Sequence, residues 1–466
     1  MKKIMFKKVE LWVVALLCVL FLIALICYGG ILRYEFLGVP KFPILKKTAL
    51  FLAEIPHNLK PSNLKRSIAL ALEPTKDLET SHIHIVKPRF KKFIHNKREE
   101  ILLLSRYDGN LNRSVVEVID LNDFSVLHTF KPDIDKINSK TDINRKEFEH
   151  LLKDKNLTRY QIKHPLILKN GDLVFKSEGS PLVKVDFCSK LLWVNDEDTF
   201  HHSSSLDHED NYWVPSRIFP FSVDKELVGD GINNFLDDAI TKISKDGKIL
   251  YQKSVAEILI ENGYKALLFG NNKSFFWDPI HLNDIEPTLN DSPFWKKDDL
   301  FLSIRSRSLI LHYRPQTNQL INVIHGPFSL QHDVDIISDR EISIFNNNAF
   351  YKYNGMGILK NNNSEVVIYN FETKQFYQKF TKSMKENSVK TVTQGLSDIL
   401  EDGSMMVEEQ EHGRILFFDN IGNLEWEYVN KADNNKIYVI NWSRVIKSKP
   451  LIESLKQKIQ NTKCIY

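Results

Sequence analysis

Runs of four to seven residues rich in Val, Ile, Leu, Phe and Tyr make up most of this chain, a pattern typical of β-strands. Turns of Pro, Gly, Asn and Asp separate the runs from about residue 100 to about residue 446. Six segments predict hairpins, and they begin at residues 114, 180, 238, 308, 364 and 413. A sheet module repeated every 49 to 70 residues predicts an all-β, six-bladed propeller, in which equivalent positions of every blade face one central channel.

Three segments depart from the strand pattern. The charged insertion 133–158 and the segment 254–263 are predicted to be partly helical, and the tail 450–463 has aliphatic residues at helical spacing. The run 437–441, which follows the sixth hairpin, is predicted to complete the first blade. Such a strand closes the ring and removes an exposed sheet edge.

The N-terminus differs in composition from the rest of the chain. Residues 1–10 carry four lysines, and residues 11–32 form a run of 22 residues without a charge. As a helix rising about 1.5 Å per residue, this run is long enough to cross a hydrocarbon core of about 30 Å. No small-residue cleavage site follows it, so we predict an uncleaved single-pass signal anchor in the inner membrane; a cleaved signal peptide is the alternative. The basic flank favours a cytoplasmic N-terminus, with the remaining chain in the periplasm or outside the cell.

These patterns divide the chain into five parts: a cytoplasmic basic tail (1–10), a transmembrane anchor (11–32), a juxtamembrane segment (33–95), the propeller (96–446) and a C-terminal tail or helix (447–466). The net charge is only +4, and no basic stripe is interleaved with aromatic residues, which argues against a nucleic-acid partner. Of four cysteines, Cys188 and Cys464 lie outside the anchor; they allow one disulfide without indicating it, and the spacing matches no zinc site.

Polar residues stand at corresponding places in successive predicted blades. Each occurs seven or eight positions before a turn or opens the equivalent strand: His164, His202, His281, His332 and Gln394. Because the first strand of each blade lines the channel of a propeller, these side chains are expected to converge there.

Three interpretations of the converging side chains are open. A histidine at a strand start is often a hydrogen-bonded structural residue, and we favour this for His164, which Pro165 follows. His202, His281 and His332 are instead candidates for catalysis. In the third interpretation the imidazoles bind a transition metal, with Asp333 or Asp335 adding a carboxylate. We predict a site without a metal.

Five motifs resemble, in order and spacing, those of the bacterial arylsulfate sulfotransferases. They are Phe200-His-His-Ser-Ser-Ser-Leu-Asp, Asp278-Pro-Ile-His-Leu-Asn-Asp, Asp299-Leu-Phe-Leu-Ser-Ile-Arg-Ser, Gln331-His-Asp-Val-Asp and Gln394-Gly…Asp402-Gly. The resemblance covers about residues 160–445. It implies a six-bladed periplasmic propeller that moves a sulfuryl group from an aryl sulfate ester to a phenolic acceptor, through a sulfated histidine and without a nucleotide donor or cofactor.

The resemblance also implies roles for individual residues. His332 of Gln-His-Asp corresponds to the nucleophile, and the His-x-Asn motif gives His281 with Asn283 as a substrate-binding residue. The Ser-x-Arg motif gives Arg305, and the His-His motif gives His202 in preference to His201. Arg307 is the rival of Arg305, since two residues that are two apart on a strand share a face.

These residue types suit sulfuryl transfer on chemical grounds. The reaction resembles phosphoryl transfer, in which positioning and stabilisation of negative charge do most of the work. A neutral imidazole is a competent nucleophile because its ordinary pKa is about 6.5. A guanidinium offers a planar fork of donors for sulfate oxygens. A second, protonated imidazole would stabilise or protonate the leaving phenolate.

The chain departs from the family pattern at three places. Ser203 stands where an Asp usually follows His-His, Asn346-Asn-Asn replaces an Asp-Asn-Gly run, and a membrane anchor replaces an N-terminal β-sandwich that builds a dimer. The main alternative function is a membrane-anchored propeller that binds a partner or polysaccharide without catalysis. A metal-dependent hydrolase of the same shape is a third interpretation.

Overall fold

The computed structural model describes residues 10–36, 48–49, 51–53, 55, 75–80, 89–224, 227, 235–269, 277–352 and 355–464. Two compact units divide the chain: Met1–Pro74 with Val223–Phe235, and Thr75–Ser222 with Leu236–Tyr466.

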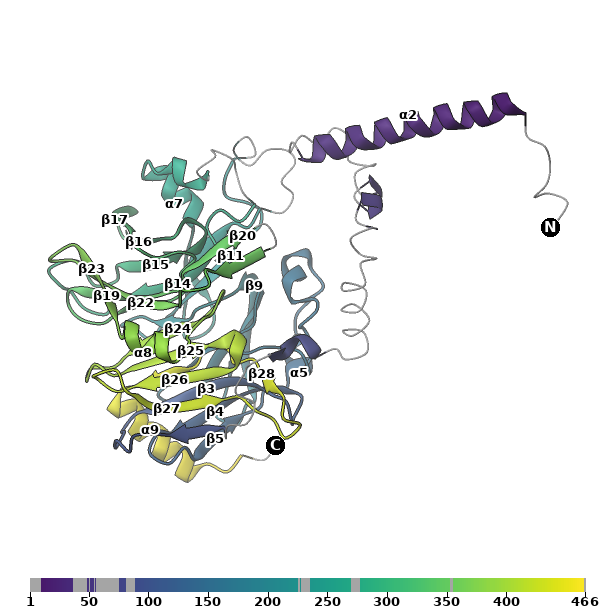
Figure 1. The fold of residues 1–466 in the computed structure, drawn as a ribbon. Coiled ribbons are helices and arrows are strands. Elements are labelled where there is room, and N and C mark those ends of the chain that lie inside the picture. The colour runs from purple at the N-terminus through teal and green to yellow at the C-terminus, as the bar shows by residue number, and fades with distance from the viewer. Residues whose placement is uncertain are drawn as a thin grey trace. The chain divides into compact units, whose positions relative to one another are not determined.

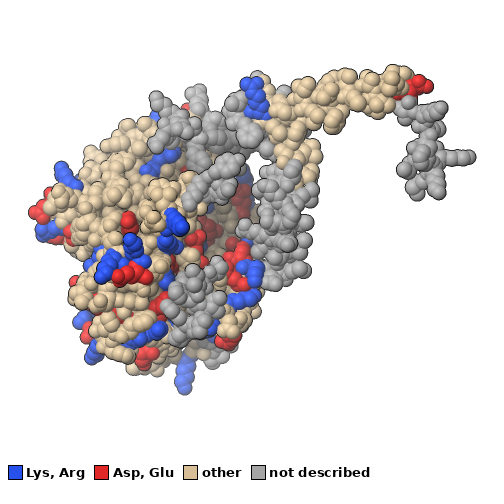
Figure 2. Space-filling view, viewed as in Figure 1, with Lys and Arg blue, Asp and Glu red and all other residues tan. Residues whose placement is uncertain are grey.

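The first unit contains one long apolar helix, α2 (Leu11–Phe36). An 18-residue window within Leu11–Tyr34 has a mean hydropathy of 3.0, and none of its residues is buried. Figure 2 shows charged atoms only at the two ends of this helix. A helix of this length and composition is compatible with a single-pass membrane anchor, and the helix predicted at 11–32 is confirmed.

The second unit consists mostly of antiparallel sheets in a propeller-like arrangement (Figure 1). In each sheet the strands are given in the order in which they pair. The first sheet is β29 (Arg444–Ile446), β3 (Ile101–Asp108), β4 (Arg113–Asp120) and β5 (Val126–Phe130). The next is an eight-stranded sheet of β6 (Lys163–Ile167), β7 (Leu173–Lys176), β8 (Ser180–Val185), β9 (Leu191–Phe200), β11 (Tyr212–Arg217), β12 (Asp238–Ile243) and β13 (Ile249–Ser254), with β10 (Ser205–Leu206) paired to β11.

Three further sheets follow along the chain. One is β14 (Leu282–Pro287), β15 (Leu300–Ile304), β16 (Leu309–Arg314) and β17 (Gln319–His325). The next is β18 (Val334–Ile336), β19 (Glu341–Asn346), β22 (Glu365–Asn370) and β23 (Gln375–Lys379), with a separate hairpin of β20 (Ala349–Lys352) and β21 (Gly355–Ile358). The last is β24 (Leu396–Ile399), β25 (Met405–Glu409), β26 (Arg414–Phe418), β27 (Leu424–Val429) and β2 (Phe90–Lys92).

All six predicted hairpins are confirmed by these pairings. The eight-stranded sheet contains two successive meanders, β6–β9 and β10–β13, which are joined where Phe200 of β9 pairs with Ser216 of β11. The predicted helical segments are also confirmed, as α5 (Ile134–Asn138) with η2 (Lys146–Leu151), α7 (Val255–Glu261) and α9 (Lys449–Asn461). Short helices η1 (Lys76–Leu78), η3 (Lys265–Leu268), η4 (Arg305–Arg307), α8 (Thr381–Glu386) and η5 (Gln410–His412) connect the strands.

The prediction that the run 437–441 completes the first blade is confirmed only for its last residues. The run begins with β28 (Ile437–Tyr438), which pairs with β1 (Glu79–Thr80) of the segment that precedes the sheets. The residues after β28 reach β3: Ile440 pairs with Arg106, and the backbone N–H of Asn441 donates to the carbonyl of Ser105. β29, a few residues later, continues this pairing along β3.

Apolar side chains on the faces of neighbouring sheets form the core. One buried cluster joins the first sheet to β7 and β8 and includes Ile452 and Leu455 of α9. Another joins Leu102 and Leu104 of β3 to strands β24–β27, so the beginning and the end of the chain's sheet region lie side by side (Figure 1). The Cys188–Cys464 disulfide links the C-terminal tail to the loop after β8.

A cavity of about 420 Å³ lies at the centre of this arrangement. Its wall contains residues from the innermost strand of each meander, β6, β10, β14, β18, β24 and β29. The starts of these strands therefore converge on one channel, as the sequence predicts.

Candidate functional site

The turns that lead into the innermost strands share an uncommon backbone conformation. His164, His202, His281, Gln394 and Trp442 have φ between 41° and 60°, and Leu330, two residues before His332, has φ of 51°. Residues with a side chain rarely adopt this left-handed region, and such residues cluster at functional sites. The regular spacing of polar residues in the sequence thus corresponds to a repeated backbone geometry at one end of the channel.

Three predicted histidines and one tryptophan lie together at this end. The ring centroid of His202 is 5.3 Å from that of His281 and 6.4 Å from that of His332. The ring centroid of Trp442 lies 6.1 Å from that of His202 and 6.4 Å from that of His332. We call His202, His281, His332 and the adjoining Arg305 the histidine cluster.

Hydrogen bonds fix the tautomer of His332, which is fully buried. The backbone N–H of Gln394 donates to Nε2 over 2.8 Å, so Nδ1 carries the proton and donates to Oδ1 of Asn347 over 2.7 Å. Asn347 is itself held by its donation to the carbonyls of Thr391 and Gln394. Burial and the nearby charge of Arg305 hold the pKa of His332 well below its usual value. The imidazole is therefore neutral at physiological pH.

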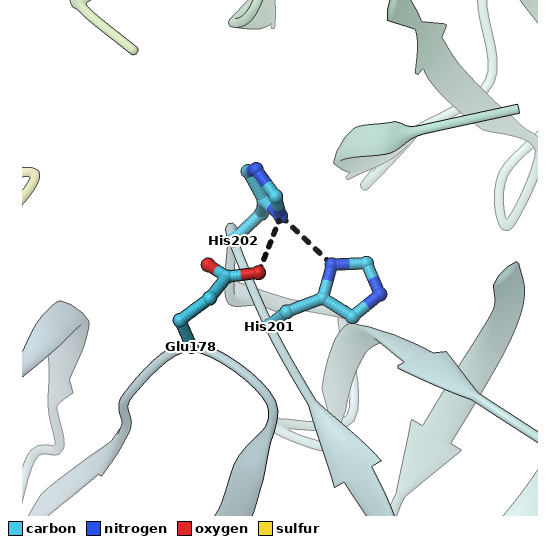
Figure 3. Close-up of side chains that lie close together, drawn as sticks. All are labelled: Glu178, His201 and His202. Atoms are coloured by element: carbon cyan, nitrogen blue, oxygen red, sulfur yellow. Dashed lines mark hydrogen bonds and ion pairs between the residues drawn. The ribbon is translucent and has the colours of Figure 1, made fainter. Parts of the chain in front are cut away.

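His201 and His202 are neighbours in a chain of polar contacts (Figure 3). Their Nδ1 atoms are 2.8 Å apart, and Oε1 of Glu178 is 3.8 Å from Nδ1 of His202. On the far side, Nε2 of His201 is 3.3 Å from Oδ1 of Asp238. Burial lowers the pKa of His202 well below its usual value, although Glu178 opposes this.

Glu178, His201 and His202 each have one potential ligand atom, and these three atoms lie within 4.8 Å of one another. They are close enough to bind one metal ion. The carboxylate beside the histidines is thus Glu178, whereas Asp333 and Asp335, the acids that the sequence suggested, line the central cavity. Lys163 Nζ and Arg217 Nη2 lie 3.2 Å and 3.5 Å from the same carboxylate. These cations already balance the charge of Glu178, so the group also serves as an ion-pair network.

His281 forms a dyad with a carboxylate that precedes it by three residues. Its Nδ1 is 2.5 Å from Oδ2 of the buried Asp278. The side chain of His281 is 22% exposed, and Nε2 has no hydrogen-bond partner among the described residues. A carboxylate that holds one ring nitrogen leaves the other free to exchange a proton with a ligand, so this dyad has the form of a general acid–base.

The other predicted residues have different surroundings. Asn283 is fully buried and donates from Nδ2 to the carbonyl of Gln331, so it holds the residue before His332 in place. Arg305 is 3% exposed, and no ion pair to it occurs among the described residues. Its guanidinium donates to the hydroxyl of Tyr351 and contacts Sδ of Met356.

Arg307 does not share a face with Arg305, contrary to the prediction. β15 ends at Ile304, and residues 305–307 form η4, whose last residue is followed by Ser308 at φ of 50°. The turn carries the two side chains apart, and Arg307 donates to the carbonyl of Leu268. His164 accepts a hydrogen bond at Nδ1 from the backbone N–H of Ser204, and such a bond is what the structural interpretation of that residue expects.

Acidic side chains line the central cavity further along the same strands. Asp284, Asp333 and Asp398 each accept a hydrogen bond from a backbone N–H of the next innermost strand, from Val334, Ser397 and Val445. We call these three residues with Glu286 and Asp335 the carboxylate chamber. Burial raises the pKa of Asp284 to about 6 and that of Asp335 to about 8, and it raises those of Glu286 and Asp333 well above their usual values.

Ser203, the departure from the family pattern, has a clear structural role. Its hydroxyl accepts from the backbone N–H of Ile285 over 3.2 Å, in the same way that Asp284 accepts from the strand after it. A serine oxygen therefore replaces the usual carboxylate as the acceptor between two strands.

Sequence reasoning missed several residues of this site. Asp278 lies inside a quoted motif, and its spacing of three from His281 is the signal that would have found it. Asn347 lies in the Asn346-Asn-Asn run, which the sequence marked only as a departure. Glu178 comes from the turn between β7 and β8 and Asp238 from the start of β12, and no local pattern relates either to a histidine.

Comparisons with known proteins agree with the motif resemblance. The profile of the arylsulfotransferase (ASST) family matches residues 164–431. No protein with a curated description matches the chain. Similar solved structures include a protein of unknown function from Bacteroides caccae, 10% identical over 75% of this chain and 99% of that one, with a TM-score of 0.46. Virginiamycin B lyase from Staphylococcus aureus is 8% identical over 73% of this chain and 87% of that one, with a TM-score of 0.34. Both similarities are distant, and nothing about substrate or reaction follows from them.

Proposed function

The chain belongs to the arylsulfotransferase family, and on this basis we propose that it moves a sulfuryl group from an aryl sulfate ester to a phenolic acceptor through a sulfated His332, without a nucleotide donor. We propose further that the meanders form six blades, with the reaction at the histidine end of their channel. The anchor α2 would then tether the propeller on the periplasmic side of the inner membrane. The Cys188–Cys464 disulfide supports an oxidising compartment.

One observation carries this proposal: a buried guanidinium that has no carboxylate partner among the described residues lies beside a neutral imidazole. Arg305 is 3% exposed, its Nε has no hydrogen-bond partner among the described residues, and its charge contributes to the lowered pKa of His332. A buried cation without a counterion is costly unless an anion completes the site. A sulfate group bound to Arg305 would place its sulfur close to a nucleophile.

The proposed reaction has two balanced steps. Nε2 of His332 forms a bond to sulfur while the bond between sulfur and the aryl oxygen breaks, and the leaving phenolate takes a proton from the Asp278–His281 dyad. In the second step the dyad removes the proton of the acceptor phenol, whose oxygen bonds to sulfur as the N–S bond breaks. Arg305 balances the charge on the sulfuryl oxygens in both steps.

The attack on sulfur places a demand on the turn at Gln394. In this structure the lone pair of Nε2 accepts the hydrogen bond from the Gln394 backbone N–H. This bond has to open before Nε2 can attack, so the turn that carries Gln394 moves as the substrate enters. Asn347 keeps the proton on Nδ1 and the lone pair on Nε2 during that change.

The test is turnover of 4-nitrophenyl sulfate by the full chain in detergent, with and without phenol. We compare the unsubstituted protein with His332→Ala and with His325→Ala, a matched control at an exposed histidine of β17. Release of nitrophenol that depends on phenol, persists in the control and is absent from His332→Ala supports the proposal. Mapping of the sulfated peptide then identifies the nucleophile, and sulfation of His281 would reassign it.

The alternative is a membrane-anchored propeller that binds a partner or polysaccharide without catalysis. Absence of release with several phenols, by protein that still unfolds cooperatively, would favour that function. Purified protein that contains stoichiometric metal would favour the metal-dependent hydrolase instead.

A further inference from the structure

The hairpin β20–β21 lies outside the ladder of its sheet and carries exposed apolar side chains. Among the described residues the two strands pair with each other, and Tyr351 stands directly opposite Met356. These two side chains therefore share one face, whereas Phe350 points to the other. Tyr351 is 62% exposed, Phe350 41% and Met356 37%. A cluster of large exposed apolar groups on one hairpin marks a surface that a ligand would cover.

The face with Tyr351 and Met356 meets the guanidinium of Arg305. Nη1 donates to the Tyr351 hydroxyl over 3.2 Å, Nη2 lies 2.7 Å from Sδ of Met356, and Cζ is 6.0 Å from the centre of the tyrosine ring. Arg305 thus has two neutral neighbours from the hairpin, and its Nε has no hydrogen-bond partner within the part of the chain that the structure describes.

These contacts are weak partners for a buried cation. A thioether sulfur is a poor acceptor, and a phenol hydroxyl carries no charge. A sulfate oxygen would make shorter and stronger charge-assisted hydrogen bonds with the same donors. An anion that binds Arg305 is therefore expected to take over these donor atoms and to leave Tyr351 and Met356 beside its organic substituent.

We propose that Tyr351 and Met356 form the subsite that holds the aromatic ring of a bound sulfate ester, and so set the preference for aryl over alkyl esters. This inference rests on the proposed binding of sulfate esters at Arg305. An aromatic ring beside Tyr351 gains an offset or edge-on contact, and a thioether adds a favourable contact at the ring edge. A small alkyl group gains little from either neighbour. Selectivity thus comes from the hairpin, while Arg305 supplies binding common to all sulfates.

The test uses two unreactive anions that differ in their substituent, benzenesulfonate and methanesulfonate. Calorimetric affinities are measured for the full chain in detergent and for Tyr351→Ala, Tyr351→Phe and Met356→Ala. Phe350→Ala is the matched control, since it removes an aromatic ring from the same hairpin on the opposite face.

We expect the unsubstituted protein to prefer benzenesulfonate by roughly fivefold to tenfold, which is the effect of an aromatic contact. Tyr351→Ala abolishes this preference and leaves methanesulfonate affinity within about twofold, because Arg305 is intact. Tyr351→Phe keeps the preference, since it retains the ring, and Phe350→Ala is unchanged. Met356→Ala lowers the preference by a smaller factor.

Two outcomes overturn the inference. One is an equal loss of affinity for both anions in Tyr351→Ala, which would mean that the hairpin only supports Arg305. The other is an unsubstituted protein without preference for the aromatic anion. Because neither sulfonate transfers a sulfuryl group, failure of the proposed catalysis leaves this measurement intact: a chain that prefers benzenesulfonate but releases no nitrophenol would keep the subsite and lose the reaction.

Discussion

The histidine cluster and the carboxylate chamber lie on the same innermost strands, only a few residues apart, yet their chemistry is opposite. His281 precedes Asp284 by three residues, and His332 is followed directly by Asp333. At one end the ionisable groups are histidines beside a guanidinium, and at the other they are mostly acids, with Arg444 and Lys447 in the same cavity wall. Burial acts on both in the same way, because it disfavours the charged form of any group. It lowers the pKa of His202 and His332 and raises that of Asp284 and Asp335.

The two ends of the channel thus differ in role: the carboxylate chamber stabilises the fold, and the histidine cluster is proposed to carry out the reaction. In the chamber, Asp284, Asp333 and Asp398 join neighbouring strands through backbone N–H groups, so their carboxylates hold the ring together. In the histidine cluster, the lowered pKa leaves a neutral imidazole next to a guanidinium that has no ion-pair partner among the described residues.

The largest effect on kcat is expected from a substitution of Arg305, the cation of the histidine cluster. Arg305→Ala removes the guanidinium that is proposed to balance charge on the sulfuryl oxygens, and loss of such a donor lowers kcat by about 10²- to 10³-fold. Arg307→Ala is the matched control, because Arg307 donates to the Leu268 carbonyl. Steady-state turnover of 4-nitrophenyl sulfate measures both. Similar losses in the two variants would contradict the assignment of Arg305.

The next effect is on the free energy of unfolding, and it is expected from a substitution of Asp284 in the carboxylate chamber. Asp284→Ala leaves the buried backbone N–H of Val334 without its acceptor, which is expected to lower the free energy of unfolding by about 1–3 kcal/mol. Asp335→Asn is the control, since the side chain of Asp335 has no hydrogen bond or ion pair among the described residues and the variant should lose none of this stability at pH 7. Denaturant unfolding compares them. A loss in Asp335→Asn as large as that in Asp284→Ala would mean that the chamber stabilises the ring by another route.

A smaller effect sharpens the role of tautomer control. Asn347→Ala removes the acceptor for Nδ1–H of His332, so the ring is free to adopt the wrong tautomer, and we expect kcat to fall by about tenfold. Asn348→Ala is the neighbouring control, because its side chain donates to the Asn363 carbonyl. Turnover with unchanged KM would agree with a role in orientation, and a raised KM with unchanged kcat would not.

The last effect is a slope of stability with pH, and its sign differs between the two regions. Asp335, with its pKa raised to about 8, keeps a proton that the unfolded chain releases above its ordinary pKa of about 3.9. The folded state therefore loses stability as pH rises from about 4 toward 8, by at most about 1.4 kcal/mol per pH unit for one group. His202, with its lowered pKa, stays neutral where the unfolded chain takes up a proton, so it costs stability as pH falls below about 6.5.

Unfolding measured across this pH range separates the two contributions. Asp335→Asn should remove the loss of stability between about pH 6.5 and 8, where His202 contributes nothing, and it should also change the slope between about pH 4 and 6.5, where both groups act. His202→Gln should change the slope only below about pH 6.5. A change above about pH 6.5 in His202→Gln would contradict this assignment.

Local sequence patterns predicted the elements correctly wherever residues interact with others that are close to them in the sequence. The six hairpins and α9 were predicted because short apolar runs and helical spacing are properties of short segments. The same reasoning was only partly right for the run 437–441, where Ile440 pairs with β3 but β28 pairs with β1, a segment far away in sequence. It failed at Arg307, because the short helix η4 follows Ile304 and ends the strand earlier than the apolar pattern suggests.

The sequence alone predicts an apolar helix and repeated hairpins. It also carries a family resemblance whose motifs mark His202, His281 and His332. Each of these follows from spacing along the chain. The tertiary structure alone brings Glu178 to His202, Asn347 to His332 and the β20–β21 hairpin to Arg305. It also joins Cys188 to Cys464, 276 residues apart. Such contacts depend on how whole sheets are placed around a channel, and that placement results from packing between distant segments, for which the local order of residues carries no signal.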